Sequence, residues 1–155
     1  MVDRMKVKEI MSSPAFTVGP DATLEAVASL MAEKNIGAVP VVDAGGRLLG
    51  LLTEGDFTGV TRAIPFNLKL APVIFGARAA TAAELESIFA KARVLPARQV
   101  MSEGVLTARE DDPLGALIQR MLADDLKHVP VVRDGRVVGM VARHDLLKAL
   151  LTKAD

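Results

Sequence analysis

The chain of 155 residues repeats itself, and this internal repeat constrains its fold more than any other feature. Met11-Ser12 returns 90 positions later as Met101-Ser102. At the same spacing, Val39-Pro40-Val41-Val42 returns as Val129-Pro130-Val131-Val132. The spacing falls to 89 after a one-residue deletion in a turn, and the match continues beyond it. A duplicated sequence predicts two similar structural units, because equal local patterns favour equal local structure.

Each copy contains one amphipathic helix pattern. Apolar residues recur at positions i, i+3, i+4 and i+7, which is one face of a helix. They are Leu24, Val27, Ala28 and Met31 in the first copy, and Leu114, Leu117, Ile118 and Met121 in the second. In the second copy we expect Asp112 to cap the helix and Pro113 to take its first position.

Two short β-rich segments follow each helix pattern. In the first copy they are 39–42 and 48–52, joined by a Gly-rich turn that is typical of a hairpin. In the second copy they are 129–132 and 137–141, with Asp134-Gly135 between them. A last helix is expected near Asp56 and from about 145 to 151.

These elements predict an α/β fold of two β-α-β-β-α repeats packed about a pseudo-twofold axis, because neither repeat can bury both faces of its sheet alone. We expect repeat 1 at 1–57, repeat 2 at 96–155 and an inserted helical linker at 58–95. The linker should hold a helix at about 82–93 that packs on the second copy, or else forms a dimer contact or a lid.

Composition excludes several classes of protein. The 19 Lys and Arg residues balance 19 Asp and Glu residues, and aromatic content is 3%, which disfavours nucleic acid as the main partner. No cysteine is present, which excludes disulfides, thiolate metal sites and cysteine nucleophiles. The apolar runs are far shorter than the ~20 residues of a membrane helix, so we expect a soluble, cytoplasmic protein without a membrane partner.

Catalytic chemistry has little support in the residues. The serines lie outside any nucleophile-elbow context, and no Gly-rich phosphate loop ending in Gly-Lys-Ser/Thr occurs. Two histidines and scattered carboxylates do not make a metal site. We therefore expect no enzyme, no catalytic residue, no metal and no catalytic cofactor.

The repeated motifs carry a resemblance to a known family. They are Ile10-Met11, 17–24, 36–43 and 50–56 in the first copy, and Val100-Met101, 126–132 and 139–145 in the second. With these motifs in the same order twice, the chain resembles a tandem pair of cystathionine-β-synthase (CBS) domains, called a Bateman module. The resemblance covers nearly the whole chain apart from about 58–95. It implies a regulatory sensor that binds AMP, ADP, ATP or S-adenosylmethionine in the clefts between the repeats.

The resemblance also assigns roles to residues. Asp56 and Asp145 would accept hydrogen bonds from ribose hydroxyls, and Thr53 would contact ribose or phosphate. A carboxylate suits a cis-diol because it is acceptor-only. A Thr-x-x-Asp segment is also a helix capping pair, and this alternative stays open. Ala142 stands in place of Thr53 in the second copy and cannot cap through its side chain, which favours a further role for Asp145.

In the family, the aspartate of one copy faces the loop before the Pro-Val-Val strand of the other. Asp56 and Thr53 would then face Lys127 and His128, which suit a phosphate. Asp145 would face Gly37 and Ala38, a site with less to hold a phosphate, although Arg143 could substitute. Adenine would lie against Val105 and Leu106 in the first site and against Ala15 and Phe16 in the second.

The resemblance further implies a homodimer that regulates a partner protein the sequence does not name. The alternative function is a dimerisation or protein-interaction module whose clefts are vestigial and bind nothing.

Overall fold

The computed structural model describes residues 4–58 and 82–151, and these form two compact units. One unit comprises Thr17–Asp43 and Leu49–Gly104; the other comprises Met1–Phe16, Ala44–Leu48 and Val105–Asp155. We call them the first and second unit, after the repeat that supplies most of each. Part of the inserted linker, 59–81, lies outside the described residues.

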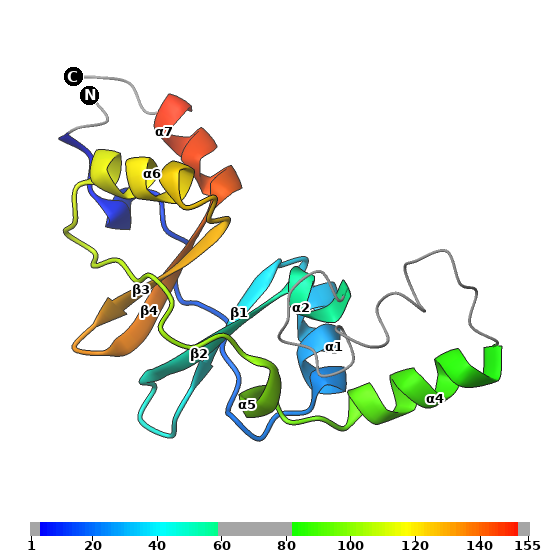
Figure 1. Cartoon of the computed structure of the whole chain (residues 1–155). Helices are drawn as coiled ribbons and strands as arrows, with labels where there is room; N and C mark the ends of the chain where they lie inside the picture. Colours follow the sequence, from blue (N-terminus) through cyan, green and yellow to red (C-terminus); the bar gives the residue numbers. More distant parts are fainter. Residues whose placement is uncertain (1–3, 59–81, 152–155) are drawn as a thin grey trace. The chain divides into compact units, whose positions relative to one another are not determined.

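The mixed α/β fold that the sequence predicts is confirmed (Figure 1). The first unit holds α1 (Leu24–Lys34), β1 (Ala38–Val42), β2 (Leu48–Thr53), α2 (Glu54–Thr58), α4 (Ala82–Arg93) and α5 (Ala97–Val100). The second unit holds η2 (Val7–Glu9), α6 (Leu114–Ala123), β3 (His128–Arg133), β4 (Arg136–Ala142), η3 (Arg143–Leu146) and α7 (Leu147–Leu151).

Each copy forms the hairpin that its turn residues predict. β1 pairs with β2, and β3 pairs with β4 in antiparallel register from His128↔Ala142 at one end to Arg133↔Arg136 at the other. Asp134 and Gly135 between β3 and β4 have φ of 53° and 79°. Positive φ at both central residues is the geometry of a two-residue turn that Asp-Gly favours.

The two repeated helices begin differently. Thr23 caps α1, since its Oγ1 accepts the Ala26 N–H at 3.2 Å. α6 has Pro113 at its N-cap and no side-chain cap. The predicted cap at Asp112 is wrong: its Oδ2 accepts the Arg109 N–H at 2.8 Å. An aspartate can bond the backbone of its own turn as readily as a helix end, and here the turn at 109–112 is the nearer donor.

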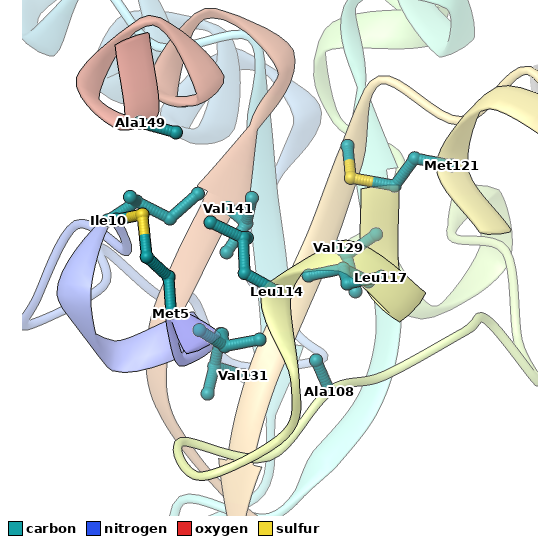
Figure 2. Close-up of a cluster of buried hydrophobic side chains, with 11 residues drawn as sticks. Met5, Ile10, Ala108, Leu114, Leu117, Met121, Val129, Val131, Val141 and Ala149 are labelled. Atoms are coloured by element: carbon teal, nitrogen blue, oxygen red, sulfur yellow. The ribbon is translucent and has the colours of Figure 1, made fainter. Parts of the chain in front are cut away.

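The hydrophobic core of each unit contains residues from both halves of the sequence. In the second unit, Met5, Val7 and Ile10 from the N-terminal segment pack with side chains of α6, β3, β4 and α7 (Figure 2). In the first unit, Ala97 and Val100 of α5 pack with side chains of α1, β1 and β2. The segment that precedes each copy therefore completes the core of the other copy.

The strand pairs are extended in the same exchanged manner. Ser12 and Met140 exchange two backbone hydrogen bonds of 2.9 and 3.0 Å, so the N-terminal segment pairs with β4. Ser102 makes the equivalent pair with Leu51 of β2. The glycine before each strand partner permits this approach: a Cβ at Gly139 would lie 2.9 Å from the Ser12 carbonyl oxygen, and one at Gly50 would lie 2.9 Å from that of Ser102.

α4 belongs to the first unit and packs against α1, whereas we had expected the linker helix to pack on the second copy. The apolar periodicity of a helix identifies which face is buried but not the partner that covers it. The chain just after α4 is bonded to the start of α1, because the Leu24 N–H donates to the Leu95 carbonyl oxygen at 2.9 Å.

Candidate functional site

The turn after β2 holds Asp56, one of the two charged residues that are buried within the described chain. Its side chain is 2% exposed, and its Oδ2 accepts the Thr53 N–H at 2.8 Å. The same turn is attached to the start of β1, because the Glu54 N–H donates to the Gly37 carbonyl oxygen at 3.1 Å. We call residues 53–56 with Gly37 and Ala38 the first turn.

The turn after β4 repeats this geometry around Asp145, which is also 2% exposed. Asp145 Oδ2 accepts the Ala142 N–H at 2.8 Å, and the Arg143 N–H donates to the Lys127 carbonyl oxygen at 2.9 Å. His128 is the register partner of Ala142. We call residues 142–145 with Lys127 and His128 the second turn.

Both aspartates therefore bond the backbone N–H three residues earlier, whatever the side chain at that position. We had expected a role for Asp145 beyond capping because Ala142 has no hydroxyl. This reason is wrong, because the donor to the aspartate is the backbone N–H in both copies. The capping interpretation of the Thr-x-x-Asp segment is correct for one oxygen of each carboxylate. This bond involves Oδ2 alone in both turns.

The second oxygen of Asp145 has a cationic neighbour. Lys148 Nζ lies 3.1 Å from Oδ1 and also donates to the Ile10 carbonyl oxygen at 3.0 Å. His144 Nε2 lies 3.7 Å from the same oxygen. Oδ1 is buried and makes no hydrogen bond within the described part of the chain. Asp145 thus has a buried acceptor beside a positive charge.

Arg143 is held on the loop before β3 by three hydrogen bonds. Besides its backbone bond to Lys127, its Nε donates to the Leu126 carbonyl oxygen at 3.1 Å and its Nη2 to Asp125 Oδ1 at 2.7 Å. The Arg143 guanidinium lowers the pKa of the Asp125 carboxyl through this bond and its charge, and the charge of Lys127 adds to the effect. The guanidinium is thereby fixed next to the second turn.

The structure groups the candidate residues by copy. Lys127 and His128 lie beside the turn of Asp145, and Gly37 lies beside the turn of Asp56. The expected contact of each aspartate with the loop of the other copy stays a prediction, because it joins residues of different units. The residues expected to contact adenine all belong to the second unit; Phe16 is exposed, and Ala15, Val105 and Leu106 are half-buried.

Sequence reasoning missed Lys148 and Asp125. The signal for Lys148 was its position three residues after Asp145, a spacing at which helical side chains meet. The signal for Asp125 was its match to Asn35 in the first copy, since both residues follow the repeated helix with positive φ, 51° and 52°.

Residues 4–58 and 82–151 contain no group of three or more His, Cys, Asp or Glu side chains arranged to hold a metal ion. No helix among them combines the length and the apolar character needed to cross a membrane.

Comparison with known proteins identifies the family of both copies. Residues 7–61 and 97–152 each match the family model of the CBS domain. The protein MJ1426 of Methanocaldococcus jannaschii is 32% identical over 155 residues, and the match covers 95% of this chain and 92% of that protein.

Two solved structures show the same fold over nearly the whole chain. The CBS domain of a CBS-domain-containing membrane protein from Sphaerobacter thermophilus is 42% identical, with a TM-score of 0.74 and coverage of 98% of this chain and 91% of that one. The CBS-domain pair of protein MJ0100, crystallised with 5′-methylthioadenosine and S-adenosyl-L-methionine, is 25% identical, with a TM-score of 0.67 and coverage of 94% and 95%.

Proposed function

Because the chain belongs to the CBS domain family, we propose that it is a regulatory module that binds an adenosine-containing ligand, namely AMP, ADP, ATP or S-adenosylmethionine. The observation that carries this proposal is the buried aspartate in the same turn of each copy. We propose that Asp56 and Asp145 accept hydrogen bonds from ribose hydroxyls. The ligand complex of MJ0100 supports the ligand class.

The chemistry of the turns suits a ribose. An ionised carboxylate accepts hydrogen bonds on two oxygens and donates none. In each turn Oδ2 accepts the backbone N–H of the residue three positions earlier. A buried acceptor without a hydrogen bond costs about 1–3 kcal/mol. Asp145 Oδ1 is ion-paired with Lys148 but accepts no hydrogen bond within the described residues, and a ribose hydroxyl would supply a donor to it.

A regulatory role requires that the ligand prefer one arrangement of the protein to another. Binding can shift an equilibrium between arrangements only by the difference between the affinities for them. We propose that occupancy is transmitted in this way to a regulated partner protein.

The test is calorimetric titration with AMP, ADP, ATP and S-adenosylmethionine, supported by thermal unfolding. A ligand at 100 times its dissociation constant should stabilise the protein by about 2.7 kcal/mol. The double variant Asp56→Asn/Asp145→Asn should lose binding, because each amide retains one oxygen for the turn N–H but loses the negative charge and the second acceptor. Its midpoint of unfolding without ligand is the control for folding. Unchanged binding by this folded variant would contradict the roles of the aspartates.

A second candidate function is dimerisation or docking on another protein without a ligand. The exposed leucines of α7 favour it, since Leu150 and Leu151 are 80% and 81% exposed. Exposed apolar side chains that gather on one element often mark an interaction surface. Light scattering would then give twice the 16.4 kDa of the chain, and Leu150→Lys/Leu151→Lys would give the monomer mass. A dimer that binds none of the four compounds would favour this function over the first.

A further inference from the structure

The second turn gathers positive charge around its aspartate. Lys148 and Arg143 are fixed by the bonds described above, and Lys127 is joined to Arg143 through its carbonyl oxygen. These three cations face two carboxylates, those of Asp125 and Asp145. The turn therefore has a net positive charge before either neighbouring histidine is protonated.

The first turn has the opposite sign. Glu54 stands where the second copy has Arg143, and Gly37 stands where it has Lys127. Asn35 matches Asp125, so the charged groups at these matched positions are the carboxylates of Glu54 and Asp56. The two turns nevertheless have the same Oδ2 hydrogen bond of 2.8 Å, although α2 is an α-helix and η3 a 3-10 helix. The copies thus share the position of the carboxylate and differ in charge.

We infer that the second turn selects an adenosine ligand that carries phosphate, whereas the first turn selects an adenosine ligand without negative charge, such as a thioether or sulfonium nucleoside. This inference rests on the proposed function and adds the charge class of ligand at each turn. It reverses the order that the sequence favoured, in which the loop cations served Asp56.

The reason is the balance of attraction and repulsion at a shared geometry. A phosphate at the second turn would be attracted by the positive charges of Arg143 and Lys127, and a guanidinium can donate two parallel hydrogen bonds to a phosphate. The same phosphate at the first turn would meet Glu54 and Asp56 with no cation at the matched positions. A sulfonium is favoured by those carboxylates and opposed by the cations of the second turn. Specificity therefore comes from repulsion as well as attraction.

The experiment titrates the single variants Asp56→Asn and Asp145→Asn with ATP and with 5′-methylthioadenosine. ATP affinity should fall at least about tenfold in Asp145→Asn and change less than about twofold in Asp56→Asn, with the reverse for 5′-methylthioadenosine. Loss of ATP binding in Asp56→Asn alone would overturn the inference and leave the proposed function standing. If neither compound bound any version of the protein, the inference would be overturned, and the proposed function would fail with it if AMP, ADP and S-adenosylmethionine also failed to bind.

A second measurement isolates the charge. Arg143→Gln should lower the ratio of ATP to adenosine affinity about fivefold or more, because adenosine shares the ribose but lacks the phosphates. The matched control is Arg136→Gln, which removes the same charge at the opposite end of the same hairpin and should leave the ratio unchanged. If Arg143→Gln lowers the unfolding midpoint, Lys127→Ala replaces it, since that change retains the carbonyl oxygen that accepts the Arg143 N–H. An unchanged ratio in both variants would overturn the inference.

Discussion

Substitution of Gly139 by alanine tests the exchanged segments directly. A Cβ at this position would lie 2.8 Å from Met11 Sδ, 2.9 Å from the Ser12 carbonyl oxygen and 3.3 Å from Met11 Cγ. The methionine side chain can move away, but the Ser12 oxygen accepts the Met140 N–H at 3.0 Å. The alanine must therefore either strain the strand or break this hydrogen bond.

The size of the effect follows from these contacts. Overpacking of a well-packed site costs about 1–3 kcal/mol, and a lost hydrogen bond adds about 0.5–1.5 kcal/mol. Replacing a glycine in a strand also stabilises the protein by up to about 1 kcal/mol, because alanine reduces the conformational entropy of the unfolded chain. We expect Gly139→Ala to lower the free energy of unfolding by about 2 kcal/mol, which corresponds to about 4–8 °C in Tm for a chain of this size.

Urea denaturation measures this loss, and Gly19→Ala is the matched control. A Cβ at Gly19 would meet no atom within 4 Å, so this variant should be as stable as the original protein or slightly more stable. The double variant Gly139→Ala/Met11→Ala removes both methionine contacts and should lose less than the sum of the single changes. Equal stability of Gly139→Ala and Gly19→Ala would refute the proposed contact.

Two smaller effects test local contacts. Thr23→Ala should cost about 1 kcal/mol, because α1 loses its N-terminal side-chain cap; Thr23→Ser, which keeps the hydroxyl, should cost less, and equal urea midpoints for both would contradict the capping role. The Lys8 ammonium, which bonds Asp111 at 3.0 Å, holds the pKa of that carboxyl below its usual range, with help from Lys6. Because the folded-state pKa is depressed, the stabilisation is complete above the ordinary pKa of an aspartate and is lost as the pH falls through the folded-state pKa. An NMR titration should show the pKa of Asp111 rising in Lys8→Ala, and an unchanged value would contradict the assigned cause.

The elements of the fold could be predicted from the sequence because their signals are local. The periodicity of Leu24 to Met31 and the Asp134-Gly135 turn each act within a few residues, and the repeat shows that both copies carry the same local signals. The helix and the turn both appear in the structure. The two aspartates could be located from the repeat as well, and the Thr-x-x-Asp spacing indicated the bond of one carboxylate oxygen to the backbone.

The sequence by itself determined that two similar units would form, each with a helix, a hairpin and an aspartate turn. Only the tertiary structure decided which segment completes which core. Ile10 and Val100 are equivalent positions with similar side chains, so the apolar pattern does not predict which core each one joins. Ile10 packs in the second unit and Val100 in the first. The same holds for Lys127, whose position beside Asp145 depends on a backbone hydrogen bond to Arg143 between residues 16 positions apart. Apolar burial is non-directional, and the choice among equivalent partners is made by chain connectivity and packing of the whole molecule.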